Sequence, residues 1–254
     1  MDHNTPPGKG SKIQTTDLQK VIADHQKWLQ TDGKDGQRAV LNEANLSHCN
    51  LQRINLSSAS LKGVNLEGAN LRCANLQMAD LRGARLCKAN LQWSIFSQSH
   101  LESANLEQAH LQFADFSKAV LDNACLTQSF LHNAYFSEAC LKSANLDKAS
   151  LPYTDFRSAD LSKASLSGTT IQLANISSAN LAGAIIYRAK ILSSNFQNAN
   201  LRRCSISEAV FEKVNFYRAD FGNASCRKSF FKACDFGEVN LNGVGRDFME
   251  AVLE

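Results

Sequence analysis

A five-residue unit decides the fold, and residues 66–90 show it most plainly: LEGAN LRCAN LQMAD LRGAR LCKAN. A large apolar residue recurs at every fifth position from Leu41 to Leu241, and 40 of these 41 positions hold Leu, Ile or Phe. The exception is Cys226. Two residues earlier stands a small or β-branched residue, which is Ala in 27 of the 41 units. Asn or Asp lies between the two in 21 units.

This five-residue period fits neither the 3.6-residue repeat of an α-helix nor the two-residue alternation of a strand. A short extended segment followed by a turn fits it, because alternation then places the small and the large residue on one inward face. The Asn or Asp between them points outward and can bond the backbone at a corner. One large and one small inward side chain per unit suit a narrow, dry core.

The phenylalanines indicate how many units make one lap. Ten Phe residues occupy the large apolar position, and seven of them are spaced by multiples of 20 residues. These seven are Phe96, Phe116, Phe136, Phe156, Phe196, Phe216 and Phe236, with Ile176 in the gap. Only Phe211, Phe221 and Phe231 lie elsewhere, so chance clustering is a poor explanation. We infer that four units make one lap, which gives about ten coils and a rod about 50 Å long at ~4.8 Å per coil.

The Ala-Asn/Asp-Leu-x-x array resembles the pentapeptide-repeat family over residues 37–243. The resemblance implies an all-β fold, a right-handed quadrilateral β-helix with a short N-terminal capping α-helix. The segment that contains His25, Trp28, Gly33, Gly36 and Ala39 resembles the lead-in of many bacterial members.

The ends of the chain follow different patterns. Residues 1–14 are polar and predict a disordered tail. Residues 15–36 predict a helix and cap, with capping-box spacing at its start, and we interpret His25 and Trp28 as cap packing rather than a site. In residues 244–254, Phe248, Met249 and Val252 could cover the last coil or pair with a second copy. A monomer and a C-terminal homodimer therefore both stay open.

Chemistry-bearing residues do not group. Of the eight cysteines, the repeat directs Cys49, Cys204, Cys226 and Cys234 inward and Cys73, Cys87, Cys125 and Cys140 outward. The chain has no Cys-x-x-Cys spacing, no Gly-rich phosphate loop and no carboxylate–His–nucleophile grouping. A straight-sided rod without inserted loops also offers no obvious cleft. We expect no enzymatic activity, no cofactor and no metal, and the cysteine usage predicts a cytoplasmic location. No apolar run approaches the ~18 residues of a membrane span.

The outward positions of the middle coils predict an exposed aromatic cluster. One row contains Trp93, Phe113, Asn133, Tyr153 and Leu173, and the row across the corner contains Ile95, Asp115, Tyr135 and Asp155. Phe130 and Pro152 belong to the same side as the first row. Because Trp and Tyr are typical anchors of interfaces, we take Trp93, Ile95, Phe113, Phe130, Tyr135 and Tyr153 as candidate protein-binding residues. The alternative is that stacked rings only stabilise the β-ladder.

The charge is nearly balanced overall, with 27 Lys and Arg against 24 Asp and Glu. Residues 186–234 are locally basic, with nine basic and three acidic residues. These charges spread over all four sides, which favours a solvated surface, and a contact with nucleic acid or an anionic lipid surface is the other interpretation.

The sequence thus favours a non-enzymatic rod that binds or scaffolds an unknown protein partner. The family resemblance implies an alternative. Some members mimic duplex DNA and bind DNA gyrase or topoisomerase IV, protecting these enzymes from quinolones. The 20 basic and 16 acidic residues in positions 41–241 disfavour this alternative, because the mimics rely on an acidic rod.

Overall fold

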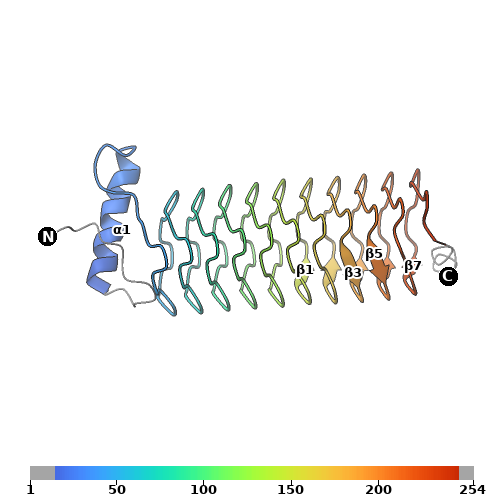
Figure 1. Cartoon of the computed structure of the whole chain (residues 1–254), viewed down its shortest axis with the longest axis horizontal. Coiled ribbons are helices and arrows are strands. Elements are labelled where there is room, and N and C mark those ends of the chain that lie inside the picture. Colours follow the sequence, from blue (N-terminus) through green and yellow to red (C-terminus); the bar gives the residue numbers. More distant parts are fainter. Residues whose placement is uncertain (1–14, 246–254) are drawn as a thin grey trace.

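The computed structural model describes residues 15–245, which wind around one long axis (Figure 1). Parallel β-bridges join each outward residue before the large apolar one to its equivalent 20 residues later, as between Asn45 and Asn65. On one wall these bridges link Val40 to Asn240 in steps of 20 residues, which makes ten laps. The quadrilateral β-helix expected from the sequence is confirmed.

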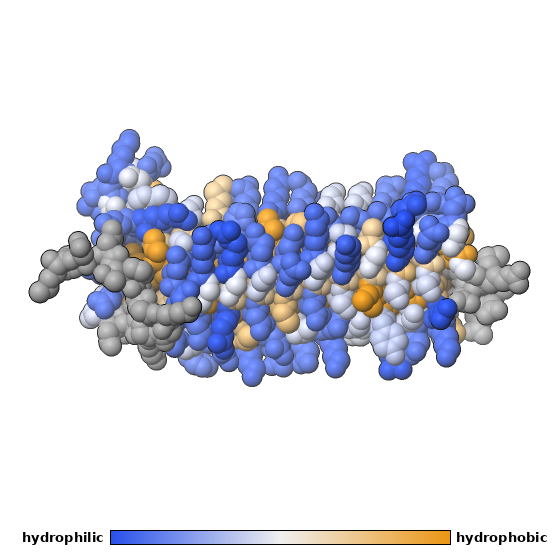
Figure 2. Space-filling view, viewed as in Figure 1, coloured by the Kyte–Doolittle hydropathy of each residue, from blue (hydrophilic) through white to orange (hydrophobic). Residues whose placement is uncertain are grey.

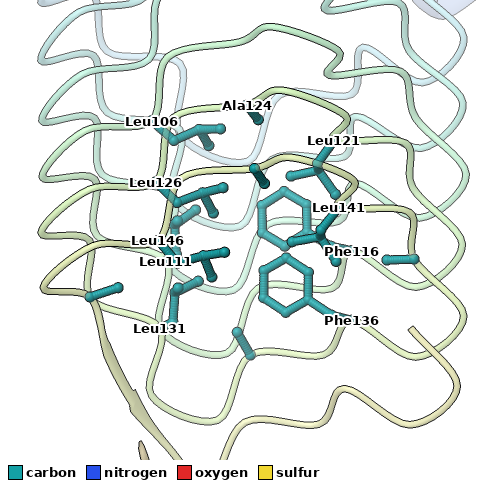
Figure 3. Packing of buried hydrophobic residues seen from close by; sticks show 14 of the residues in the cluster. Leu106, Leu111, Phe116, Leu121, Ala124, Leu126, Leu131, Phe136, Leu141 and Leu146 are labelled. Atoms are coloured by element: carbon teal, nitrogen blue, oxygen red, sulfur yellow. The ribbon is translucent and has the colours of Figure 1, made fainter. Parts of the chain in front are cut away.

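The core is a narrow column of side chains that repeats at every lap. The ring centroid of Phe116 lies 4.7 Å from that of Phe96 and 4.8 Å from that of Phe136, and all three side chains are fully buried. Figure 3 shows Phe116 and Phe136 one above the other, with leucines of the other walls around them. The predicted column of stacked rings inside the rod is confirmed.

The turns depend on a left-handed residue in every unit. The residue two positions after the large apolar one has positive φ in all 41 units from Glu43 to Gly243, with values between 48° and 71°. In most units the turn is closed by a backbone hydrogen bond, such as the one that Ala44 N–H donates to the Leu41 carbonyl at 3.2 Å. Positive φ at the third residue is the mark of a type II turn.

Asn and Asp hold these turns in place. The Oδ1 atom of Asn45 accepts a hydrogen bond from the N–H of Ser47, two residues later, at 3.1 Å. All 21 Asn and Asp residues at this position make the same bond. The predicted corner bond to the local backbone is therefore confirmed.

Some turns of the C-terminal half open into three-residue strands. A five-stranded parallel sheet has the order β1-β2-β4-β6-β7 and consists of β1 (Ser150–Pro152), β2 (Thr170–Gln172), β4 (Lys190–Leu192), β6 (Val210–Glu212) and β7 (Phe230–Lys232). On the neighbouring wall, β3 (Ile185–Tyr187) pairs with β5 (Ser205–Ser207). None of these strands begins with Asn or Asp, and every central residue except Leu151 is Ile or Phe. Such residues favour extended backbone, and no side-chain amide holds the tight turn there.

A helix covers the first coil. Helix α1 (Thr15–Gln30) lies across one end of the rod in Figure 1. The buried ring of His25 stacks on Trp28, and its Nδ1 atom accepts a hydrogen bond from the N–H of Ala39 at 3.1 Å. Burial lowers the pKa of His25, which keeps the ring neutral and able to accept this bond. Gly36 has φ +76°, and a Cβ atom there would lie 2.3 Å from the Asp24 carbonyl oxygen.

The capping helix is confirmed, and His25 and Trp28 belong to its junction with the rod. The expected division into residues 1–14, 15–36, 37–243 and 244–254 stays a prediction. Residues 1–14 and the segment with Phe248, Met249 and Val252 lie outside the described residues. The choice between an intramolecular cap and a homodimer contact is thus not decided by the fold.

Candidate functional site

One of the four walls carries the candidate residues, and we call it the aromatic wall. Its centre line is the buried stack of every twentieth residue from Leu51 to Phe231. The wall consists of the outward residues that stand one position before, one after and two after each member of this stack. It includes Trp93, Phe113, Phe130 and Tyr153. Ile95 and Tyr135 lie in the adjoining row across the corner, where they alternate with Asp115 and Asp155.

Five of the six candidate side chains are exposed. The exposed fraction is 50% for Trp93, 56% for Tyr153 and 48% for Tyr135, with Ile95 and Phe130 near two fifths. Phe113 is half-buried because the Trp93 ring stacks on it, at 4.0 Å between centroids and 2° between planes. Phe130 stacks in the same way on His110 of the preceding lap, at 5.1 Å. The structure thus gathers the six residues on one wall and its adjoining row.

The backbone under the aromatic row is left-handed, which sequence reasoning missed. Trp93 has φ 61°, Phe113 has φ 62° and Tyr153 has φ 58°. Bulky residues adopt this conformation at a cost, and Gly or Asn suits it better. Among the 41 equivalent positions, only Met78, Trp93, Phe113, Tyr153 and Leu173 hold a large apolar or aromatic residue. Four of these five lie on the aromatic wall, so local backbone preference does not explain the row.

The middle of the aromatic wall carries no formal charge. Between Arg72 and Lys190, its outward positions contain no Asp, Glu, Lys or Arg. They are Cys73, Asn90, Gln92, Trp93, His110, Gln112, Phe113, Phe130, His132, Asn133, Ser150, Pro152, Tyr153, Thr170, Gln172 and Leu173. Amides, imidazoles and rings therefore form an uncharged strip five to six coils long. Such a strip is suited to burying apolar and hydrogen-bonding groups of another molecule.

The net charge of the repeat region lies on this same wall. Within residues 41–241 the aromatic wall has five basic residues, Arg53, Arg72, Lys190, Lys213 and Lys232, and one acidic residue, Glu212. The other three walls together have 15 basic and 15 acidic residues. Figure 2 shows one face of the rod on which hydrophilic side chains predominate and hydrophobic residues stand singly.

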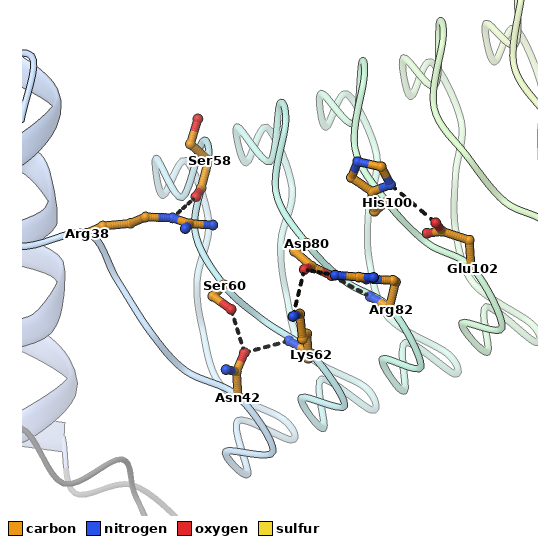
Figure 4. A network of polar contacts seen from close by, with 9 residues as sticks. All are labelled: Arg38, Asn42, Ser58, Ser60, Lys62, Asp80, Arg82, His100 and Glu102. Atoms are coloured by element: carbon orange, nitrogen blue, oxygen red, sulfur yellow. Dashed lines mark hydrogen bonds and ion pairs between the residues drawn. The ribbon is translucent and has the colours of Figure 1, made fainter.

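At least nine of the 15 basic residues on the other walls are in ion pairs. Figure 4 shows one such network, in which the Asp80 carboxylate contacts Arg82 at 2.6 Å and Lys62 at 3.3 Å. The hydrogen bond from Arg82 is the main reason why the pKa of Asp80 falls to about 2. Further pairs join Arg188 to Glu208, Arg202 to Asp220 and Arg218 to Glu238. Within residues 15–245, no ion pair joins side chains of the aromatic wall.

Two exposed residues of the aromatic wall were missed as candidates. Val210 and Phe230 continue the row of Phe130 toward the C-terminal end, and 56% of Phe230 is exposed. Both could have been predicted by grouping all outward residues that are spaced by multiples of 20, because such residues lie in one row. Leu173, which the sequence placed in the aromatic row, is exposed there as well.

The cysteines and the other polar groups show no reactive arrangement. Burial raises the pKa of both the Cys204 and the Cys226 thiol to about 12, so neither is a thiolate at neutral pH. Across residues 15–245, no three His, Cys, Asp or Glu side chains come together as a metal site. In the same range, no helix has the length and apolar character needed to cross a bilayer.

The geometry defines a four-sided β-solenoid, and the comparisons place it in a family. A family model described as pentapeptide repeats matches in segments between residues 32 and 187. A second model with the same description matches residues 196–242. These matches cover more than half of the chain, which therefore belongs to the pentapeptide-repeat family.

Among the solved structures that share the fold are HetL and QnrB1. HetL, a pentapeptide repeat protein involved in heterocyst differentiation regulation from the cyanobacterium Nostoc sp. strain PCC 7120, aligns with a TM-score of 0.64 at 22% identity. The alignment covers 92% of this chain and 99% of HetL. QnrB1, a plasmid-mediated fluoroquinolone resistance protein, aligns with a TM-score of 0.56 at 17% identity, over 86% of this chain and all of QnrB1. No curated protein matches the chain.

Proposed function

We propose that this chain is a non-enzymatic rod that binds a partner protein through its aromatic wall. The observation that supports this proposal is the row of Trp93, Phe113 and Tyr153 in left-handed backbone, in which Trp93 and Tyr153 are exposed and Phe113 is half-buried under the Trp93 ring. Rings held on a rigid ladder lose little conformational freedom when they are buried by a partner, which makes them effective anchors. The uncharged strip around them removes the desolvation penalty that charged groups would add.

The competing explanation is that the rings only stabilise the ladder. The Trp93–Phe113 stack is a good one, and a stacked pair contributes ~0.5–1.5 kcal/mol. The left-handed backbone does not enter this balance, because Ser, Lys and Gln at the same position of other units have the same φ. The contribution of the stack is small beside the ~3–5 kcal/mol lost when a buried Phe is truncated, which favours a role outside folding.

Affinity capture from the native cell lysate tests the proposal. The bait proteins are the wild type, Trp93→Ser/Phe113→Ser, and a control, Ile185→Ser/Tyr187→Ser, which removes two exposed apolar side chains from the neighbouring wall. We expect a partner to be captured by the wild type and the control but lost from the Trp93/Phe113 variant, while the variant stays folded and loses less than about 2 kcal/mol of stability. Equal capture by all three baits would overturn the proposal.

A second candidate function is the DNA mimic that binds gyrase or topoisomerase IV. The fold likeness to QnrB1 favours it, but the surface charge argues against it. The 20 basic residues of positions 41–241 exceed the 16 acidic ones, and the other walls are neutral in sum. A gyrase supercoiling assay with ciprofloxacin distinguishes the two proposals. Protection of gyrase at micromolar protein would establish the DNA mimic and overturn the proposed role of the aromatic wall.

Contact with nucleic acid or an anionic surface through the basic C-terminal third is the third candidate. At least three of its nine basic residues, Arg188, Arg202 and Arg218, are already in ion pairs. Lys190, Lys213 and Lys232 follow one another on the aromatic wall, whereas Arg203, Arg227 and Lys228 lie on other walls, so the row of three could contact only a short stretch of phosphates. Salt-sensitive retention on heparin would favour this candidate, and flow-through at low salt would remove it. A cytoplasmic location belongs to the same set of proposals and rests on the cysteine usage.

A further inference from the structure

The charges of the aromatic wall are segregated into two basic ends and an uncharged centre. Arg53 and Arg72 stand at one end, and Lys190, Lys213 and Lys232 stand at the other. None of the five is in an ion pair within the described chain, whereas at least nine of the 15 basic residues of the other walls are. The only acidic residue of this wall is Glu212. Unpaired positive charge therefore flanks the ring-bearing strip on both sides.

The length of the uncharged strip sets the minimum length of a ligand that contacts both basic ends. Arg72 and Lys190 are about six laps apart, which corresponds to about 28 Å at ~4.8 Å per coil. An extended polypeptide covers that distance with eight or nine residues at ~3.3 Å each.

We propose that the aromatic wall binds a polypeptide segment whose apolar centre is flanked on both sides by acidic residues. The apolar centre packs on Trp93, Phe113, Phe130 and Tyr153, where the wall is uncharged. The acidic flanks lie over Arg53 and Arg72 at one end and over Lys190, Lys213 and Lys232 at the other. The amides of Gln92 and Gln112 are hydrogen-bonded to each other at 3.2 Å, which leaves the Gln92 oxygen and the Gln112 NH₂ group, together with the Asn133 amide, to bond the backbone of the segment between these flanks.

Charge segregation favours a polypeptide over the other occupants. A nucleic-acid strand carries a charge about every 3.4 Å, so about eight phosphates would lie over the uncharged centre without a basic partner. An anionic bilayer is uniformly charged in the same way. A second copy of this wall would bring two sets of five basic residues and one acidic residue together. Only a chain with its own acidic–apolar–acidic pattern matches all three zones.

This inference rests on the proposed function, and the experiment separates the two. A phage-displayed library of random twelve-residue peptides is selected on the wild-type rod, and the affinities of the selected peptides are then measured for three variants. The centre variant is Trp93→Ser/Phe113→Ser. The end variant replaces Arg53, Arg72, Lys190, Lys213 and Lys232 by Gln. The control variant replaces Lys88, Lys148, Lys163, Arg203 and Lys228 of other walls by Gln, which removes the same charge.

We expect the selected peptides to carry Asp or Glu toward both ends and aromatic or aliphatic residues between them. Their affinity should fall at least ~10-fold for the end variant and less than ~3-fold for the control variant, because close complementary charges contribute to binding. Affinity for the end variant should also lose its dependence on salt.

Each contrary outcome has one meaning. Peptides that depend on the centre pair but bind the end variant as well as the wild type would overturn the acidic flanks and leave the binding wall intact. A selection in which no peptide depends on Trp93 and Phe113 would overturn both proposals. Wall-dependent binding of oligo(dT) or of phosphatidylglycerol vesicles, with no peptide selected, would replace the polypeptide by a uniformly charged ligand.

Discussion

Two columns of aromatic rings follow the same 20-residue spacing, one inside the rod and one outside. Inside, Phe96, Phe116, Phe136 and Phe156 stack at 4.7 to 5.0 Å between centroids and are shielded from water. Outside, Trp93 and Phe113 stack at 4.0 Å, yet half of the Trp93 surface remains exposed. Stacking geometry is thus shared by the two columns, and burial is what differs.

The difference shows that stacking in a regular ladder is not enough for a ring to stabilise the fold. An inner Phe gains from leaving water and from close packing on all sides. An outer ring gains a single stacked neighbour and stays partly in water, so its contribution to folding is smaller. The outer column therefore leaves aromatic surface uncovered, as the proposed binding wall requires.

The largest expected effect is on the inner column. Phe136→Ala should lower the free energy of unfolding by about 3–5 kcal/mol, because it leaves a cavity in a core that cannot collapse around it. Phe136→Leu is the control, since Leu56 and Leu76 occupy the equivalent position in two other laps, and it should lower the free energy by less than about 1.5 kcal/mol. Denaturant unfolding measures both. A cost below about 1 kcal/mol for Phe136→Ala would mean that the inner rings contribute no more to the free energy of unfolding than the outer rings.

The stability contributed by the ion pairs of Asp80, on another wall, is expected to depend on pH. The pKa of Asp80 is lowered to about 2, chiefly by the Arg82 hydrogen bond. A lowered pKa means that the carboxylate stabilises the fold above pH 4, where it is ionised in both states, and that this stabilisation is lost as the pH falls toward 2. The contribution is at most about 2 kcal/mol.

Thermal melting of wild type and Asp80→Asn checks this expectation. The difference in Tm should be largest near pH 6 and should shrink between pH 4 and pH 2. A difference that is constant over this range would show that the Asp80 pairs contribute nothing through charge.

A smaller effect is expected for the amides that hold the turns. Asn195→Ala removes the bond from the Gln197 N–H, which is 3.0 Å long, and should cost about 1 kcal/mol. Thr170 is the matched control, because it takes the same position on the aromatic wall, in β2, where no such bond forms. Thr170→Ala should cost less than Asn195→Ala in denaturant unfolding. Equal costs would mean that the walls do not differ in how their turns are held.

Much of the fold could be predicted because the repeat has no break. The spacing of Leu41, Leu46 and their successors fixes what points inward, and the spacing of Phe96, Phe116 and Phe136 fixes the lap. The corner bonds of Asn and Asp follow from their short polar side chains. The left-handed residue of each turn was missed, although Gly63, Gly68 and Gly83 at that position were a usable signal.

The candidate site was only partly predictable. The rows of Trp93 and Ile95 follow from the lap, but the half-burial of Phe113 depends on how one ring lies over another. The opening of turns into β1 to β7 was not predicted either. These strands lack Asn or Asp at their first position, but so do the units of Ile95-Phe96 and Tyr135-Phe136, which stay tight turns. The identity of a partner depends on the partner's surface as well, so one sequence can predict only the chemistry of this wall.

The most direct test of the difference between the columns is the stability of the outer pair. Denaturant unfolding of Trp93→Ser/Phe113→Ser should show a loss of less than about 2 kcal/mol, which is the scale of one exposed stack and two surface substitutions. A loss of about 3 kcal/mol or more, comparable with that of a single inner Phe→Ala, would contradict the account, because the outer rings would then be part of what holds the rod together.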